Sequence, residues 1–337
     1  MSQKEIKKIV LTGDRPTGRL HLGHYIGSIQ NRINLQGEAD KSWYMIADIQ
    51  ALTDNADNPT KVRSNVLEVA LDNLACGVDP TKTTFFIQSQ VPGIAELTVL
   101  FLNLVTLARL KRNPTVKDEM KQKGFGEEVP AGFLMYPVSQ AADILFVNAN
   151  RVPVGADQLP MIEQANEIVQ KFNSLYGEVF SKIEAVISET GRLPGLDGKA
   201  KMSKSLNNAI YLSDSNEVIE EKVNAMFTDP DHIHVEDPGK VEGNVVFSYL
   251  DIFDNDKKGL DELKEQYRRG GLGDTVIKKR LSQILQDIIA PIRERREYLA
   301  QNPKKVMDIL RDGTAEANKM AEETLRKVKE AIQINYF

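Results

Sequence analysis

The segment Lys8–Ser28, KIVLTGDRPTGRLHLGHYIGS, decides the fold of the chain. Its first residues, Lys8–Thr12, form a short aliphatic and β-branched run that predicts a strand. A turn containing proline and glycine follows, and apolar spacing after the turn predicts an amphipathic helix. Glycines allow a close approach of backbone to ligand, and a helix start favours an anion. The segment therefore predicts an anion site at the carboxyl end of a first strand.

Two of the four histidines of the chain lie in this turn. His21 and His24 are three residues apart, so on a helical turn they share a face and can donate hydrogen bonds to one phosphate chain. The pattern is not a P-loop, because GxxxxGK[ST] does not occur in the sequence. No GxGxxG follows the first strand either, which disfavours a dinucleotide site.

A second segment with phosphate-binding character is Gly195–Ser205, GLDGKAKMSKS. It places three lysines and two serines in a loop bordered by glycine. Such a loop can close on a polyphosphate, and a lysine that reaches the phosphates mainly in the transition state raises the rate. Taken by itself, the loop is explained equally well as a solvated hinge.

Outward from these segments, the first two hundred residues alternate between strand and helix patterns. Further strands are expected at Trp43–Ala47, Thr84–Ser89 and Ile144–Val147, with helical periodicity between them. Alternation of this kind predicts an α/β fold with a doubly wound, mainly parallel sheet. After Tyr211 the strand pattern fades, and four helices are expected. Their ranges are Glu217–Phe227, Leu260–Tyr267, Asp274–Leu299 and Lys304–Ile334.

Length and composition agree with this organisation. The 337 residues suffice for about two domains. We expect an α/β domain at 1–205, a helical domain at 206–305 and, after them, a C-terminal helix at 306–337. The single cysteine, Cys76, excludes a disulfide framework, a multi-cysteine zinc site and an iron–sulfur cluster. The start of the chain lacks the apolar core of a signal peptide, and the longest apolar stretch, Val99–Leu110, is too short and too polar to span a membrane. We therefore expect a cytoplasmic protein.

Charge is distributed unevenly along the chain. The whole sequence has 43 basic and 48 acidic residues, a net charge of −5. Between Lys257 and Lys305, however, 13 basic residues stand against 7 acidic ones, 13 − 7 = +6. This region is interpreted either as a solvated helix face or as a phosphate-binding surface. Its clusters are Lys257-Lys258, Arg268-Arg269, Lys278-Lys279-Arg280, Arg293 with Arg295-Arg296, and Lys304-Lys305.

Together, HxGH after the first strand and KMSKS about 180 residues later resemble the signature of class I aminoacyl-tRNA synthetases. Within that class the sequence is most similar to the tryptophanyl-tRNA synthetases, essentially from end to end. The likeness is carried by GDRPTGRLHLGHYIGS, FIQSQVP, YPVSQAADIL, VPVGADQ and KAKMSKS. The resemblance implies a Rossmann-like catalytic domain with an insertion, followed by a helical anticodon-binding domain.

The resemblance also implies the chemistry. Members of the family activate their amino acid with Mg-ATP, release pyrophosphate and transfer the aminoacyl group to the 3′ end of the tRNA. The implied partners are L-tryptophan, ATP with its Mg²⁺, tRNA(Trp) whose phosphates meet the basic clusters, and a second copy in a homodimer. The apolar stretch Ile94–Leu110 is a candidate for the contact between copies. No protein-bound metal is expected, and the loop His232-Ile233-His234 with its acidic neighbours is interpreted as structural.

By the same likeness, ATP-binding and catalytic roles fall on residues of both motifs and of VPVGADQ. The implied catalytic residues are His21, His24, Lys201 and Lys204. The implied ATP-binding residues are Arg15, Pro16, Thr17, Gly23, His24, Gly155, Ala156, Asp157, Leu193, Lys201, Met202, Ser203, Lys204 and Ser205.

Tryptophan would be recognised by Asp143, Tyr136, Gln158 and Gln140. A carboxylate in an apolar pocket can accept the indole N–H, whereas Tyr136 and Gln158 suit the α-ammonium. The spacing Tyr136-x3-Gln140-x2-Asp143 also resembles the pocket of tyrosyl-tRNA synthetases. Tyrosine thus remains an alternative substrate, and a noncatalytic tRNA-binding paralogue or a small-molecule adenylyltransferase remains an alternative function.

Overall fold

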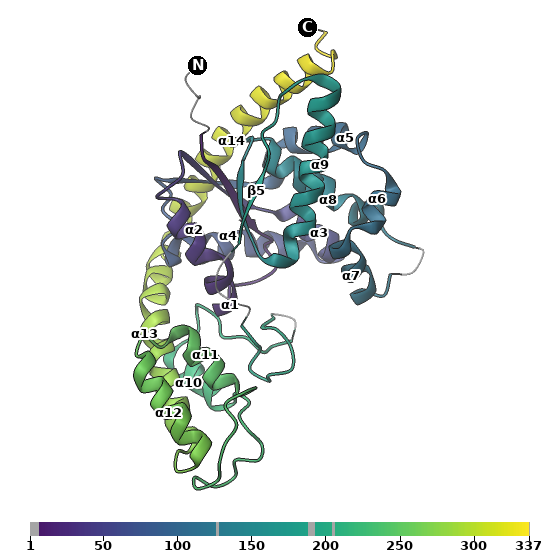
Figure 1. Cartoon of the computed structure of the whole chain (residues 1–337). Helices are drawn as coiled ribbons and strands as arrows, with labels where there is room; N and C mark the ends of the chain where they lie inside the picture. The colour runs from purple at the N-terminus through teal and green to yellow at the C-terminus, as the bar shows by residue number, and fades with distance from the viewer. Residues whose placement is uncertain (1–6, 126–127, 188–192, 204–205, 337) are drawn as a thin grey trace, which may run out of the picture. The chain divides into compact units, whose positions relative to one another are not determined.

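The computed structural model describes residues 7–125, 128–187, 193–203 and 206–336. Two compact units are present (Figure 1). The sheet unit comprises Met1–Gly18, Ser28–Ser188 and Asn302–Phe337, and the helical unit comprises Arg19–Gly27 and Glu189–Gln301. Each is described on its own.

The sheet unit is built on five parallel strands in the order β3-β2-β1-β4-β5. Leu11 on β1 lies opposite Trp43 on β2, which lies opposite Thr84 on β3. The strand order reverses direction between β1 and β4, and ligands of open α/β sheets bind beyond the carboxyl ends of strands at such a point. The strands are β1 (Ile9–Asp14), β2 (Lys41–Ile46), β3 (Thr83–Ile87), β4 (Arg151–Val154) and β5 (Glu184–Ile187).

Helices connect the strands, and their ends carry local sequence signals. In α4 the Asn58 side chain accepts the amide hydrogen of Lys61, Pro59 occupies the first turn, and Gly77 ends the helix at φ +110°. The helices of the sheet unit are α2 (Gln30–Leu35), α3 (Asp48–Asn55), α4 (Pro59–Cys76), α5 (Pro92–Leu102), α6 (Leu107–Arg112), α7 (Pro114–Gln122), α8 (Ala131–Leu145), α9 (Leu159–Tyr176) and α14 (Pro303–Ala331).

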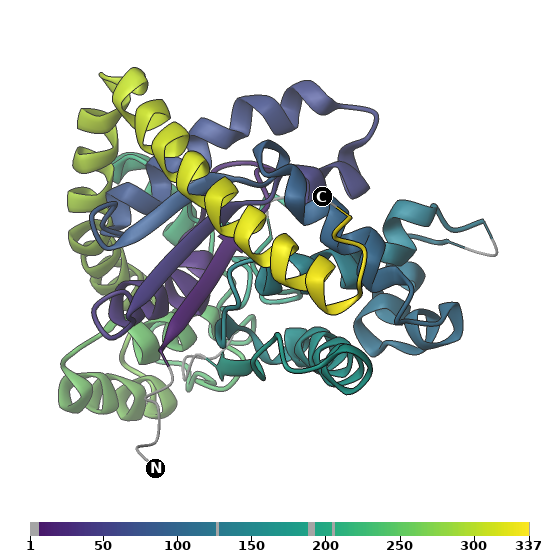
Figure 2. The same cartoon turned by 90° about the horizontal axis from the view of Figure 1, so that it is seen from above.

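The last helix, α14, returns to the sheet unit and packs beside β3, as Figure 2 shows. At Gly313 a Cβ atom would come within 2.0 Å of the Phe85 carbonyl oxygen, so only glycine permits this approach. The next residue, Thr314, accepts the Ile87 amide hydrogen through Oγ1 at 3.2 Å. The C-terminal helix therefore covers the edge strand of the sheet.

The core of the sheet unit is rich in aromatic residues. Trp43, Phe86 and Phe146 are at most 1% exposed and contact one another edge to face. This cluster lies between the sheet and helices α5, α8 and α9. It determines which face of α8 is turned away from solvent.

The helical unit contains α1 (Leu22–His24), α10 (Asn216–Asn224), α11 (Val245–Phe253), α12 (Lys257–Arg269) and α13 (Asp274–Ala300). The long helix α13 packs against α10 and α11 through buried apolar residues such as Leu281 and Leu285. Asn244 begins α11 by accepting the amide hydrogens of the two residues beyond Val245.

Several sequence predictions need correction. Ile144–Val147 is not a strand; α8 continues through Leu145, and the fourth strand is β4. All four residues are buried, and a short apolar run does not distinguish a buried helix end from a buried strand. The apolar stretch Ile94–Leu110 forms two helices, α5 and α6, which are interrupted at 103–106. The sequence reading did not identify β5 or α11.

The predicted α/β sheet followed by helices is confirmed. The helices expected near 217–227, 260–267, 274–299 and 304–334 are present as α10, α12, α13 and α14. Among the described residues, 193–203 pack with the helical unit and 302–336 with the sheet unit. The compact units therefore have other limits than the expected domains, whose functional roles stay predictions. None of the described helices combines the length and apolarity needed to cross a membrane.

Candidate active site

In the helical unit, the turn that bears the histidines is paired with a distant part of the chain. The Leu22 amide donates to the Ile210 carbonyl at 2.9 Å, and the Leu212 amide donates to the Leu20 carbonyl at 3.1 Å. His21 and Tyr211 thus form an antiparallel bridge. These bonds fix the turn to the segment that follows the lysine loop.

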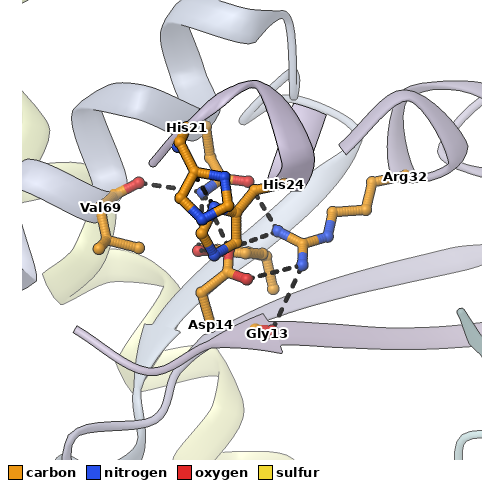
Figure 3. Close-up of polar contacts among 8 residues, drawn as sticks. Gly13, Asp14, His21, His24, Arg32 and Val69 are labelled. Atoms are coloured by element: carbon orange, nitrogen blue, oxygen red, sulfur yellow. Dashed lines mark hydrogen bonds and ion pairs between the residues drawn. The ribbon is translucent and has the colours of Figure 1, made fainter. Parts of the chain in front are cut away.

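The two histidines lie against each other within this turn, with ring centroids 3.8 Å apart (Figure 3). His24 Nδ1 accepts the His21 amide hydrogen at 3.2 Å. In its neutral form His24 therefore carries its proton on Nε2, where it is a donor suited to a phosphate oxygen. His21 is 7% exposed, so it is the more deeply placed of the pair.

The lysine loop is a short antiparallel turn. Pro194 and Lys201 form its bridge, the Gly195 amide donates to the Ala200 carbonyl at 2.7 Å, and Gly198 turns the chain at φ +67°. Lys201 is exposed, as expected for a cation that meets a ligand. Lys204 and Ser205 lie outside the described residues.

Asn208 holds this loop, and the sequence reading missed it. Its Oδ1 accepts the Ser203 amide hydrogen at 2.8 Å, and its Nδ2 donates to Asp197 Oδ1 at 3.3 Å. Gly195 is required here, because a Cβ would lie 2.0 Å from Asn208 Nδ2. The only signal was position, three residues beyond KMSKS.

The two predicted motifs meet directly. Met202 of the lysine loop receives the Gly23 amide hydrogen on its sulfur at 3.3 Å, and a Cβ on Gly23 would lie 3.0 Å from the His21 ring. Leu193, which leads into the loop, is 4% exposed, and its carbonyl accepts the Met202 amide hydrogen. The structure therefore joins HxGH and KMSKS across 179 residues of sequence.

In the sheet unit, the other expected ATP-binding residues lie beyond β1 and β4, the strands at the reversal point. Arg15, Pro16 and Thr17 follow β1, and Arg15 is exposed. Gly155, Ala156 and Asp157 follow β4 and are exposed. They form the start of a helical segment in which the Gln158 amide donates to the Gly155 carbonyl at 2.9 Å.

The expected tryptophan-binding residues of α8 share a helix face. Tyr136, Gln140 and Asp143 follow one another at intervals of four and three residues, which places them on one side of the helix. Tyr136 and Gln140 are half-buried, and Asp143 is 1% exposed. Gln158 lies apart from α8 in the chain, half-buried, with Nε2 3.3 Å from Asp157 Oδ2.

Asp143 is a buried carboxyl group with a single regular hydrogen bond. Gln88 Nε2 donates to its Oδ1 at 2.7 Å, whereas Oδ2 has no hydrogen-bond partner among the described residues. Burial raises the pKa of Asp143 to about 7. The side chains of Gln88 and Gln50 lower this pKa, and the negative charge of Asp48 raises it further. Gln50 acts on the carboxyl without reaching regular hydrogen-bond geometry.

A second buried cluster lies at the end of β1 and was not predicted. Arg32 on α2 forms a bidentate pair with Asp14 at 2.5 and 2.9 Å, and its Nη2 also faces the Gly13 carbonyl (Figure 3). Tyr44 donates to Asp14 Oδ2 at 2.8 Å, and Asn73 bonds to Asp14, Arg32 and Tyr44. This network anchors the residue that immediately precedes Arg15.

The histidine loop and the basic clusters are now placed. His232 directs Nδ1 at the Asp237 carbonyl and Nε2 at the Leu272 carbonyl, at 2.8 and 3.0 Å, contacts of a structural residue. Within the described ranges, no three His, Cys, Asp or Glu side chains are grouped to hold a metal. Two basic residues expected to face phosphates, Arg268 and Arg280, each pair with two carboxylates.

A parallel sheet with a reversal point, and a histidine turn bonded to a KMSKS loop, are the marks of a class I aminoacyl-tRNA synthetase. The family model described as tRNA synthetases class I (W and Y) matches residues 3–290. The tryptophan–tRNA ligase of Clostridium longisporum is 58% identical over 98% of both chains, and that of Lactococcus lactis is 55% identical over 98% of this chain and 99% of its own.

Solved structures agree with these relatives. The tryptophanyl-tRNA synthetase of Campylobacter jejuni, in complex with ADP and tryptophan, is 33% identical with a TM-score of 0.84, covering 96% of this chain and 99% of its own. The chain therefore belongs to the class I tRNA synthetases for tryptophan and tyrosine and is an aminoacyl-tRNA synthetase.

Proposed function

We propose that the chain activates L-tryptophan with Mg-ATP to tryptophanyl-adenylate and pyrophosphate, and then transfers tryptophan to the 3′ end of tRNA(Trp). The relatives that are 54–58% identical over nearly the whole chain are tryptophan–tRNA ligases. The observation that carries the choice of amino acid is the buried Asp143, whose Oδ2 is without a hydrogen-bond partner among the described atoms.

Tryptophan is selected through its single ring donor. The indole N–H donates to Asp143 Oδ2, and an amino acid that lacks this donor leaves a buried acceptor unpaired, which is costly in a dry pocket. Gln140, on the same face of α8, borders the ring, and Tyr136 with Gln158 binds the α-ammonium group.

In this proposal ATP is bound by residues of the predicted motifs. Arg15, Pro16 and Thr17 beyond β1, and Gly155, Ala156 and Asp157 beyond β4, contact the nucleotide, with Asp157 accepting from ribose hydroxyls. Gly23, Leu193, Met202, Ser203 and Ser205 complete the contacts. Mg²⁺ arrives with ATP as part of the substrate.

The chemical step needs positioned charge more than proton transfer. A carboxylate attacks the α-phosphorus in line, so no general base is required, and stabilisation of the departing pyrophosphate sets the rate. His21 and His24 donate to the phosphate chain, with the His24 proton placed on Nε2 by the bond to Nδ1. Lys201 and Lys204 neutralise the pyrophosphate as it leaves.

The remaining proposals concern partners and location. The exposed lysines of the basic clusters, such as Lys258 and Lys279, contact tRNA phosphates. Val99 and Leu107, which are 60% and 66% exposed on α5 and α6, lie in the contact of a homodimer. The cytoplasm is the proposed location.

Exchange of labelled pyrophosphate into ATP, run with each of the twenty amino acids, tests the proposed activity. Exchange with tryptophan alone is expected. Exchange with tyrosine alone would identify the chain as a tyrosine enzyme, and no exchange with any amino acid would identify a noncatalytic paralogue. A fully active His24→Ala variant would remove that histidine from the phosphate site.

The pocket assignment has its own measurement. Asp143→Ala is expected to weaken tryptophan binding by ~1–3 kcal/mol, because the indole N–H loses its acceptor. Calorimetric titration of tryptophan measures the change. An unaltered dissociation constant would remove Asp143 from the pocket.

A further inference from the structure

The side-chain amide of Gln88 has only one orientation that satisfies its neighbours. Its Oε1 accepts the backbone amide hydrogen of Gln50 at 3.1 Å, a donor that cannot change its role. Its Nε2 must therefore face Asp143 Oδ1, 2.7 Å away, and act as the donor there. A backbone group on α3 thus determines which end of Gln88 meets the carboxyl group.

This contact makes the two oxygens of Asp143 different from each other. Oδ1 is occupied by Gln88, whereas Oδ2 has no hydrogen-bond partner in the described part of the chain. Gln88 and Asp143 are each 1% exposed, so bulk water does not compensate for the difference. A donor supplied by a ligand has a single unoccupied oxygen to meet.

The groups around the carboxyl also determine its charge. Asp48 on α3 is the charged residue that acts on it, and it opposes ionisation, as does burial. The uncharged side chains of Gln88 and Gln50 favour ionisation. Among described residues, no charged group from α5, α6 or α9, the other helices against α8, adds to this balance.

We propose that Gln88 is a positioning residue for amino-acid specificity: by binding Oδ1 it favours the ionised form of Asp143 and presents Oδ2 to the indole N–H. The inference rests on the proposed function, since it requires Asp143 to be the indole acceptor. Gln88 does not touch the substrate in this view. It acts through Asp143, and the 3₁₀ turn Gln88–Gln90 holds it directly beyond the carboxyl end of β3.

A purely structural role for Gln88, as the hydrogen bond that links the end of β3 to α8, predicts a different result. Loss of that bond would lower the stability of the protein and would weaken the binding of all ligands of the pocket alike. Loss of the positioning role would weaken only those ligands that use the N–H. A pair of ligands that differ at this one atom separates the two roles.

The experiment compares tryptophan with β-(1-benzothiophen-3-yl)alanine, in which sulfur replaces the indole N–H, by calorimetric titration. Wild-type protein is expected to prefer tryptophan, and in Gln88→Leu the preference is expected to fall by roughly tenfold. The matched control is Gln90→Leu, the same substitution two residues further along the turn at an exposed side chain. It is expected to keep the wild-type preference.

A second readout is the pH profile of tryptophan affinity. Binding to wild-type protein is expected to strengthen as pH rises through about 7, because the ionised Asp143 is the better acceptor. In Gln88→Leu the midpoint is expected to move to higher pH, because a donor that favours ionisation is gone. Gln88→Glu keeps the size and the acceptor for Gln50, and it serves if the leucine variant does not fold. Its second oxygen and Oδ1 must share a proton, so the midpoint moves in the same direction.

The outcomes separate this inference from the proposed function. If Asp143→Ala loses the preference while both Gln88 variants keep it with an unshifted midpoint, the positioning role of Gln88 is wrong and the pocket assignment stands. If Asp143→Ala itself keeps the preference, both are wrong. Loss of preference in the Gln88 variants but not in Gln90→Leu supports the inference.

Discussion

The buried carboxyl groups of the sheet unit and the exposed lysine loop of the helical unit are held in opposite ways. Asp14 and Asp143 are fixed by side chains from other elements, Arg32 and Gln88, and are largely removed from solvent. The lysine loop is fixed by backbone bonds, glycines and Asn208, while Lys201 stays exposed. Discrimination between ligands needs a dry, fixed acceptor, whereas a charge that acts on a leaving group needs access to it.

This comparison implies that substitutions in the two regions change different quantities. Replacing a buried partner leaves a desolvated charge behind, so stability or affinity should change. Replacing an exposed lysine leaves nothing buried, so only the rate should change.

The largest effect is expected for Arg32→Ala, which should lower the free energy of unfolding by ~3–5 kcal/mol, because Asp14 keeps its burial and loses its bidentate partner. Urea unfolding measures the loss. Arg63→Ala, at an exposed position on α4, is the control and should leave the unfolding curve in place. A loss for Arg32→Ala no larger than that of the control would show that the network does not stabilise the end of β1.

The next effect concerns pH. Asp143 has an ordinary pKa of 3.8 and a folded value of about 7, so the folded state binds a proton more tightly than the unfolded state does. This group's contribution to stability is full below pH 4 and is lost as pH rises through about 7. Over that interval the loss is expected to reach up to about 4 kcal/mol.

Asp143→Asn should remove this loss, because the amide does not titrate. Urea unfolding of both proteins at intervals between pH 4 and 8 gives the difference, which should grow in favour of the variant as pH rises. A difference that does not change with pH would mean that burial does not perturb Asp143, and the contrast with the exposed loop would lose its electrostatic basis.

The fold was predictable where the signal is local. The runs at 8–12, 43–47 and 84–89 overlap the strands β1, β2 and β3, because their β-branched and aromatic residues favour strand structure and can be recognised locally. The strand predicted at 144–147 failed because its burial comes from tertiary packing around Phe146, and not from alternation. In β5 the residues Glu184–Ile187 are exposed or half-buried and too few to show a pattern.

For the candidate site, the sequence could name only residues that lie in recognisable motifs. His21, Met202 and Asp143 lie in motifs that are readable along the chain, and the contact between Gly23 and Met202 agrees with the pairing of the motifs. Gln88, Arg32 and Asn73 could not be assigned. Their roles depend on partners 55, 18 and 59 residues away, and no spacing rule connects residues whose proximity results from the fold.

In the lysine loop, Lys204→Ala is expected to lower the rate of tryptophan activation on the order of 10²-fold with little change in tryptophan affinity, because the charge acts mainly in the transition state. Pyrophosphate exchange and tryptophan titration measure the two quantities. Lys182→Ala, an exposed lysine outside the loop, is the control and should keep the wild-type rate. A large loss of tryptophan binding in Lys204→Ala would contradict the assignment.

The smallest effect tests whether burial, and not pairing itself, makes Arg32 important. Arg109 on α6 forms an equally regular bidentate pair with Glu167 on α9, with both bonds at 2.8 Å, but the side chains are 25% and 49% exposed. A double-mutant cycle of Arg109→Ala and Glu167→Ala, measured by urea unfolding, should give a coupling of ~0.5–1 kcal/mol that declines at high salt. Both ion pairs are bidentate. A coupling as large as the loss for Arg32→Ala would therefore mean that the bidentate contact itself, and not its removal from water, explains the importance of Arg32.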